Sequence, residues 1–154
     1  MGKVLKFADK IKKIKRTADV IFFDDNGEEV SFKLESRSEE LIDDVNHKYD
    51  ALKPQVPTKR LPSANGKFKV IEDHDNAEYR KALGKIQKKN FAELALLFLA
   101  EEERPEGTLE EQVEQIQQVE FAGFVAKIVQ RGLEISGVIE EESFEDEIED
   151  AKND

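Results

Sequence analysis

Residues 90–100 read NFAELALLFLA and contain the longest apolar run in the chain. Upstream of this run, apolar residues recur at intervals of three and four, which is the spacing of one helix face. Asp75 and Glu78 have the spacing of a helix capping box, in which side chains bond the free amides at the helix start. The pattern therefore predicts one long central helix over residues 76–102.

The second half of this helix is apolar almost all round. Traced at 100° per residue, its main stripe consists of Tyr79, Leu83, Ile86, Leu94 and Leu97, with Phe91 and Phe98 beside it. Leu96 and Leu99 lie on the back of the helix, away from this stripe. Such a helix is either buried on several sides within its own fold or covered by a partner. Both interpretations stay open for residues 91–99.

A second helix is expected over residues 108–131, because Thr108 and Glu111 again have capping-box spacing after a breaker at residues 104–107. Its apolar stripe changes direction near its middle. The first half carries Leu109, Val113 and Ile116, and the second half carries Phe121, Phe124, Val125 and Ile128. The helix therefore bends near Gly123, or its halves pack on different neighbours, one of which could be another chain.

Towards the N-terminus, two runs of strand-forming residues flank Asn26 and Gly27 and predict a β-hairpin over residues 19–35. Asn-Gly favours a type I′ turn, which requires positive φ at both central residues. An isolated hairpin is marginal in water, so its apolar face should pack on a helix or join further strands. Ser36 and Glu39 predict the start of a following helix. Its expected apolar face consists of Leu41, Val45, Tyr49 and Leu52.

The stretch KPQVPTKRLP at residues 53–62 holds three of the chain's four prolines. Proline lacks an amide donor and restricts the residue before it, which disfavours both a helix and a central strand. We therefore expect residues 53–66 to form an extended, exposed connection. Alternation around Phe68 and Val70 could add one short strand after it.

The chain carries 24 Lys and Arg residues against 35 Asp and Glu residues, and this net charge of −11 is unevenly distributed. Residues 1–16 are basic, and residues 3–16 could form a short helix whose apolar stripe is Val4, Phe7, Ile11 and Ile14. We expect this helix to pack on its own domain, with docking to another protein, or to nucleic acid or a membrane, as alternatives. Residues 140–154 are strongly acidic and predict a solvated tail.

Together these elements predict one domain of mainly α class with a small N-terminal β-hairpin, an α+β fold whose helices pack on one another. Gly132 and Gly137 supply stop signals for the last helix. The expected segments are a basic helix, hairpin and helix at residues 1–52, a Pro-rich connection with a short strand at 53–71, a helical core at 72–139, and a flexible, disordered acidic tail at 140–154.

The sequence offers no constellation for catalysis. It has no Cys, and its eight glycines lack the spacing of a phosphate-binding loop. His47 follows Asp44 by three residues and His74 stands in an acidic turn, but neither repeats the ligand pattern of a metal site. We therefore expect a non-enzymatic protein without metal or cofactor. A membrane span is not expected either, because it needs roughly 18 or more consecutive apolar residues.

Three stretches in this order, DNAEYRKAL at residues 75–83, ELALLFLA at 93–100 and GTLEEQVEQIQ at 107–117, precede a charged C-terminus. This order resembles the tail assembly chaperones of long-tailed (siphovirus-type) bacteriophages or prophages. The resemblance covers residues 70–135. It implies a helical, non-enzymatic protein of the cytoplasm, which is the host cytoplasm if a phage encodes it. Such a protein binds the hydrophobic tape measure protein and helps the tail tube protein to assemble around it.

The expected partner-binding surface combines residues of both long helices: Phe91, Leu94, Leu96, Leu97, Phe98, Leu99, Phe121 and Phe124. Nucleic acid and membrane are not expected as partners, and the chain could also form a homo-oligomer. The net charge suggests an alternative function, an acidic mimic of nucleic acid or another regulatory protein-binding module. That alternative requires carboxylates arrayed at phosphate-like spacing on the folded surface.

Overall fold

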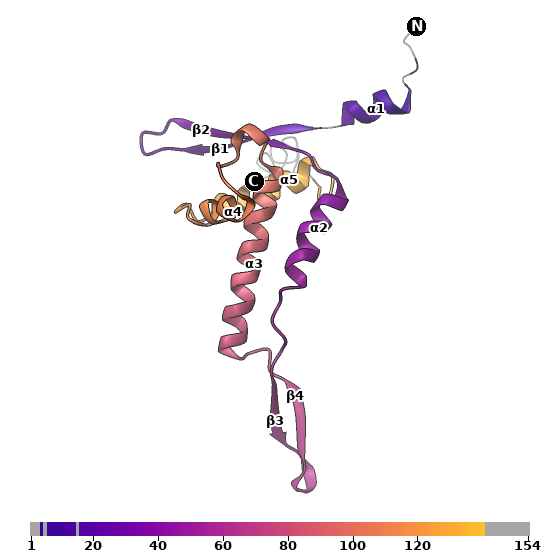
Figure 1. Cartoon of the computed structure of the whole chain (residues 1–154), viewed down its shortest axis with the longest axis vertical. Helices are drawn as coiled ribbons and strands as arrows, with labels where there is room; N and C mark the ends of the chain where they lie inside the picture. Colours follow the sequence, from indigo (N-terminus) through magenta and orange to yellow (C-terminus); the bar gives the residue numbers. More distant parts are fainter. Residues whose placement is uncertain (1–3, 5, 15, 141–154) are drawn as a thin grey trace, which may run out of the picture.

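The computed structural model describes residues 4, 6–14 and 16–140 of the chain. Within them, five α-helices and two antiparallel hairpins form an elongated molecule (Figure 1). The helices are α1 (Phe7–Ile14), α2 (Glu39–Asp50), α3 (Ala77–Phe98), α4 (Leu109–Gln117) and α5 (Phe124–Ile135). The strands are β1 (Thr17–Phe23), β2 (Glu29–Glu35), β3 (Thr58–Pro62) and β4 (Phe68–Glu72). The α+β class is therefore as expected, with one more hairpin than the sequence predicts.

The elements are distributed along the length of the molecule. α2 and α3 lie side by side, and the β3–β4 hairpin extends beyond the start of α3 (Figure 1). The β1–β2 hairpin lies across the other end of α3, where α4 and α5 also pack. The core of the molecule lies at this end, and α1 projects away from it. No helix in the described part of the chain is long and apolar enough to cross a membrane.

The second half of α3 forms the centre of the core. α2, α4 and α5 all pack on α3, and the residue that follows the helix, Leu99, bridges to Leu34 of β2. Leu96 and Leu99, which lie on the back of the helix, are consequently only 3% and 1% exposed. Internal burial is thus the observed state of these two leucines, and it explains why the helix needs apolar residues on nearly every side.

Both ends of α3 differ from the prediction. Asn76, and not Asp75, caps the helix, because the Asn76 side chain accepts a hydrogen bond from the Tyr79 amide at 2.9 Å. The helix ends at Phe98 instead of continuing to residue 102. The backbone becomes extended there, and the Ala100 amide donates to the Lys33 carbonyl at 2.9 Å. Pairing with the edge of β2 therefore replaces the last helical turn.

The first hairpin is confirmed, but its turn is not of type I′. Gly27 has positive φ (76°), whereas Asn26 does not. The Gly27 amide donates to the Asp24 carbonyl, and the Asp24 amide donates to the Glu28 carbonyl. This is a three-residue loop with glycine at its left-handed position, which the Asp24 side chain supports by accepting from the amides of residues 26 and 28.

The helix after the hairpin starts two residues later than expected. Ser38 caps α2 by accepting a hydrogen bond from the Leu41 amide, whereas the Ser36 hydroxyl accepts one from the Arg16 amide. The buried face also differs from the predicted stripe: Ile42 and Tyr49 are buried, and Leu41 and Leu52 are exposed.

The Pro-rich segment contains a strand that the sequence analysis excludes. β3 pairs with β4 to form a second antiparallel hairpin, in which Pro62 ends β3 opposite Phe68. Proline is tolerated at this position because both strands are edge strands and the ladder ends there. The expected short strand around Phe68 and Val70 is confirmed as β4, but the expected strand-free connection over residues 53–66 is wrong.

The predicted helix over residues 108–131 is two helices. Thr108 caps α4 as expected, since its hydroxyl accepts from the Glu111 amide at 3.3 Å. α4 ends at Gln117, and α5 runs on to Ile135 because Gly132 lies inside the helix instead of ending it. The break lets each half of the segment bury its own stripe. Gly137, with φ of 78°, follows the last turn of α5 as expected for a helix stop.

The basic N-terminal segment does not pack on its own domain in the described residues. α1 is shorter than predicted, and its apolar side chains are exposed: Val4, Phe7, Ile11 and Ile14. The expectation of an internal position is therefore wrong for this helix. Of the predicted acidic tail, only Glu140 belongs to the described part, and residues 141–154 lie outside it.

Candidate functional site: an apolar groove beside the central helix

The eight predicted partner-binding residues fall into two groups. Five of them are buried core residues: Leu94, Leu96, Phe98, Leu99 and Phe124, of which Phe124 also lines a groove. Leu97 is half-buried at the edge of the core. Phe91 and Phe121 are the exceptions, because 51% and 60% of these residues remain exposed. The continuous docking surface expected over residues 91–99 is therefore not present.

Phe91 and Phe121 instead lie at one groove that the sequence did not indicate. This groove, here called the α3–α5 groove, has a volume of about 650 Å³ and lies between α3, the 118–123 connection, α5 and the segment after α5. Its walls combine buried core residues with exposed apolar ones. The residues that define it are Phe91, Val119, Phe121, Phe124, Leu133 and Ile139.

The helix break creates the groove. Because α4 stops at Gln117 and α5 begins at Phe124, Phe121 stands in a connection and not on a helix face. Its ring makes an edge contact with Phe22 of β1, at a centroid distance of 5.5 Å, and Phe22 in turn contacts Phe124 at 5.3 Å. The Phe121 side chain is thus held in place from the hairpin side while it remains open to solvent.

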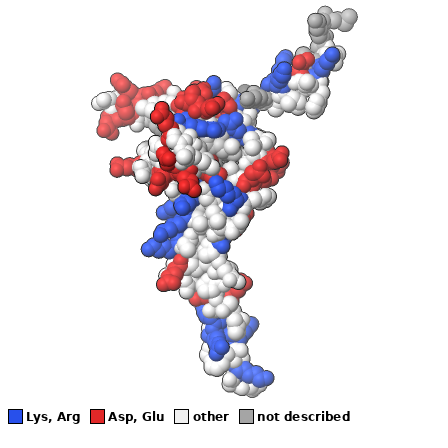
Figure 2. All heavy atoms as spheres, viewed as in Figure 1, with Lys and Arg blue, Asp and Glu red and all other residues white. Residues whose placement is uncertain are grey.

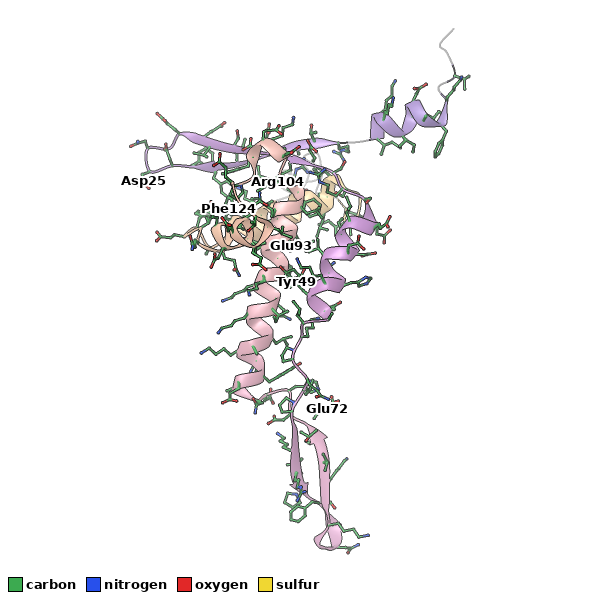
Figure 3. All side chains as sticks on the ribbon, in the orientation of Figure 1. Asp25, Tyr49, Glu72, Glu93, Arg104 and Phe124 are labelled. Carbon is green, nitrogen blue, oxygen red and sulfur yellow. The ribbon has the colours of Figure 1, made fainter. Side chains whose placement is uncertain are left out.

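On the other side of α3, a buried carboxylate fixes α2. Glu93 is 6% exposed, and its Oε1 accepts hydrogen bonds from Lys48 Nζ at 2.6 Å and from the Tyr49 hydroxyl at 3.1 Å. Burial, followed by the negative charge of Glu93 and its hydrogen bond, raises the pKa of Tyr49 to about 12. Figure 3 shows Glu93 and Tyr49 facing each other between the two helices. Lys48, Tyr49 and Glu93 thus connect α2 to α3, a contact that no local sequence pattern predicts.

Two arginines hold the end of α3, which is near the hairpin. Arg37 Nε donates to the Leu97 carbonyl at 2.7 Å, and Arg104 Nε donates to the Leu99 carbonyl at 3.1 Å. Cations at a helix C-terminus satisfy free carbonyls and complement the helix dipole. Burial, with a smaller effect from the charge of Arg37, lowers the pKa of Arg104. Two arginine side chains from outside the helix therefore satisfy the free carbonyls at the end of α3.

The two histidines lie away from the groove. His74 Nε2 lies 2.9 Å from Glu72 Oε2 at the base of the second hairpin, and both side chains are exposed. His47 and Asp44 are exposed on α2. In the described ranges, no group of three or more His, Asp or Glu side chains is placed to hold a metal ion. The α3–α5 groove contains two exposed residues of the predicted partner-binding set, and its lining is predominantly apolar.

The groove also contains three polar residues among its apolar lining. Lys88, Gln117 and Gln130 provide polar groups at its border, so an apolar ligand could be oriented by hydrogen bonds at the edges. Comparisons with protein-family models, with curated proteins and with solved structures found no match to this chain. The ligand of the groove is therefore inferred from the groove's own residues and from the resemblance described above.

Proposed function

We propose that this chain is a non-enzymatic tail assembly chaperone that holds an apolar helical segment of the tape measure protein in the α3–α5 groove. One observation carries the proposal: Phe91 and Phe121 remain half exposed at an apolar groove whose inner wall is core. Soluble monomers rarely leave contiguous apolar surface exposed, so such a patch indicates a binding site for a partner.

The size and chemistry of the groove suit one face of a helix. A volume of about 650 Å³ accommodates a few bulky side chains, which an amphipathic helix presents at intervals of three and four residues. Complete burial of one Phe side chain contributes about 1.5–3 kcal/mol before the entropy cost of association. Two such anchors on this side, with matching residues on the partner, would support a specific complex.

The rest of the surface suits a chaperone. Charged residues make up 38% of the chain, and a high net charge keeps a protein that binds apolar segments in solution. The resemblance to tail assembly chaperones supports two further parts of the proposal. The first is a role in assembly of the tail tube protein around the tape measure protein. The second is action in the cytoplasm, which would be that of the host cell for a phage-encoded chain.

The alternative, an acidic mimic of nucleic acid, is less well supported. Such a mimic needs a continuous array of carboxylates along its surface. In this chain, residues 53–90 contain ten basic residues against four acidic ones, and they form one end of the elongated molecule. The array of negative charge is therefore interrupted over a large part of its length.

Co-purification with a tape measure protein tests the proposal. The chain is co-expressed with an affinity-tagged tape measure protein, and Phe91→Asp with Phe121→Asp is compared with the wild type. We expect the double variant to lose the complex while it keeps its helical circular-dichroism signal, because both side chains are already exposed. Phe23→Asp is the matched control, since Phe23 is 67% exposed on β1 and does not line the groove. Equal capture by the groove variant and the wild type would reject the groove as the binding site.

A further inference from the structure

The charge of the molecule is separated along its length. The stalk, defined here as residues 53–90, contains ten basic and four acidic residues, whereas the head, residues 17–52 and 91–140, contains six basic and 22 acidic residues. Figure 2 shows basic side chains along the hairpin and the lower part of α3, and acidic side chains gathered over the head. Between residues 17 and 140, the molecule thus has a cationic end and an anionic end.

The β3–β4 hairpin at the tip of the stalk is exposed to solvent. All five residues of β3 are exposed, and on β4 Phe68 is 66% and Val70 is 62% exposed. A two-stranded hairpin with both faces in water is only marginally stable by itself. Arg60 and Lys69, which project from this hairpin, form no ion pair with any residue in the described ranges. The hairpin therefore offers both apolar and cationic groups to a partner.

The helix above the hairpin continues the cationic surface. Lys81, Lys85 and Lys89 are exposed and follow one another at intervals of four on α3. Like charges at this spacing repel each other along a helix face. On α4 in the head, the exposed Glu110 and Glu114 repeat the same spacing with the opposite sign. The lysines of α3 and the glutamates of α4 would therefore neutralise each other's repulsion if the two surfaces came into contact.

We propose that the stalk binds the head of a second copy of this chain. The β3–β4 hairpin and the lysine face of α3 lie on the acidic face of α4 of the neighbouring copy, and Phe68 packs near the half-exposed Leu109. The two contacting surfaces are different, so the contact is heterologous, and each bound copy still offers a free stalk or a free head. Association therefore continues into open chains or closes into a ring.

Charge complementarity favours this occupant over nucleic acid. Phosphates attracted to the stalk would be repelled by the head of the same molecule, in which 22 acidic residues outnumber six basic ones. A second copy offers the half-exposed Leu109 beside the carboxylates of α4, so it matches the exposed Phe68 of the stalk as well as the lysines, which a phosphate backbone cannot do. The proposal is also independent of the α3–α5 groove, since the hairpin, Lys81, Lys85, Lys89, Glu110 and Glu114 do not line it.

Sedimentation velocity of the full chain and of two neutralised variants tests the inference. The stalk variant is Arg60→Gln with Lys69→Gln, and the head variant is Glu110→Gln with Glu114→Gln. We expect the wild type to form oligomers at about 0.05 M salt and monomers at about 0.5 M salt, because screening weakens exposed charge contacts. Each variant alone should be monomeric at the lower salt. An equimolar mixture should form dimers and stop there, since only one intact stalk and one intact head remain to meet.

Several results would overturn the proposal. They are a wild type that stays monomeric at low salt, a variant that still forms oligomers alone, and a mixture that does not associate. Loss of binding to a single-stranded oligonucleotide by the stalk variant, with unchanged self-association, would instead assign the stalk to nucleic acid. Asp43→Asn with Asp44→Asn is the matched control, because it neutralises two exposed acids on α2 and should leave association intact. The groove variant described above should also still self-associate.

Discussion

Gly132 of α5 lies against the ring of Phe98 at the end of α3, so closely that a Cβ at position 132 would overlap the ring. The two helices therefore approach each other at the one position where α5 has no side chain. Phe98 is completely buried at this contact. The absence of a side chain at Gly132 thus allows α5 to approach α3 closely enough to pack on the Phe98 ring.

Replacement of Gly132 by Ala should destabilise the protein by about 1–3 kcal/mol, because the added methyl group forces the Phe98 ring out of its position. Urea unfolding followed by circular dichroism measures the change. Gly84→Ala in α3 is the control, since a Cβ there meets no atom within 4 Å. This control should stabilise the protein by about 0.5–1 kcal/mol through helix propensity. A stabilised Gly132→Ala would show that the two helices are not tightly packed.

A charged residue in place of a core leucine should unfold the chain, and should not act only by weakening the binding of a partner protein. We expect Leu96→Asp or Leu99→Asp to abolish the folded circular-dichroism signal, since a charge would be buried without a partner. The milder Leu96→Ala should cost about 2–5 kcal/mol in urea unfolding. A folded Leu96→Asp protein with native helix content would contradict the buried position and return this leucine to the surface.

The stability of the protein should fall with rising pH above about pH 10. Folding raises the pKa of Tyr49 from 10.0 to about 12, so the folded state favours the neutral hydroxyl. The associated stability is present below pH 10 and is lost as the pH rises towards 12. Tyr49→Phe should show a smaller fall over this range in urea unfolding at several pH values. It should be less stable near neutral pH by about 1 kcal/mol, because Glu93 loses a hydrogen bond. Parallel pH curves for the two proteins would disprove the coupling.

The two candidate caps of α3 can be separated by mutation. Asn76→Ala should destabilise the protein by about 1 kcal/mol, because the Asn76 side chain bonds the Tyr79 amide. Asp75→Ala should have an effect near zero, since its exposed side chain makes no cap hydrogen bond in the structure. The difference between the two thermal midpoints is the measurement. A larger loss for the Asp75 variant would restore the cap expected from the sequence.

Local patterns predicted much of the fold. The Thr108 cap, the first hairpin and the long apolar helix all follow from residues close together in the sequence, and the structure contains each of them. Non-local contacts account for the errors. α3 ends early because residue 100 pairs with residue 33, a contact that no short window of sequence contains. The rule against proline in strands excluded β3, although Pro62 only ends that strand.

The groove was predictable only in part. The sequence predicts Phe91, Phe121 and Phe124 as partner residues, because they are large apolar residues of the two long helical patterns, and all three line the groove. Which of them would be exposed depends on the break between α4 and α5, and the change in stripe direction indicated a bend but not an open connection. Glu93 stands within an apolar run, and a charged residue in that position was the available signal for the tie to α2.

The contact between β2 and the residues after α3 has a consequence for synthesis. The first hairpin is complete once residue 35 has left the ribosome, but its edge partner, residue 100, follows about 65 residues later. At ~5–20 residues per second, the wait lasts roughly 3–13 seconds. During this interval the hairpin surface that later packs on α3 and α5 is uncovered, and the two Phe side chains that enter the aromatic cluster, Phe22 and Phe32, are exposed to solvent. The hairpin therefore depends on residues made much later in the chain to bury its aromatic face.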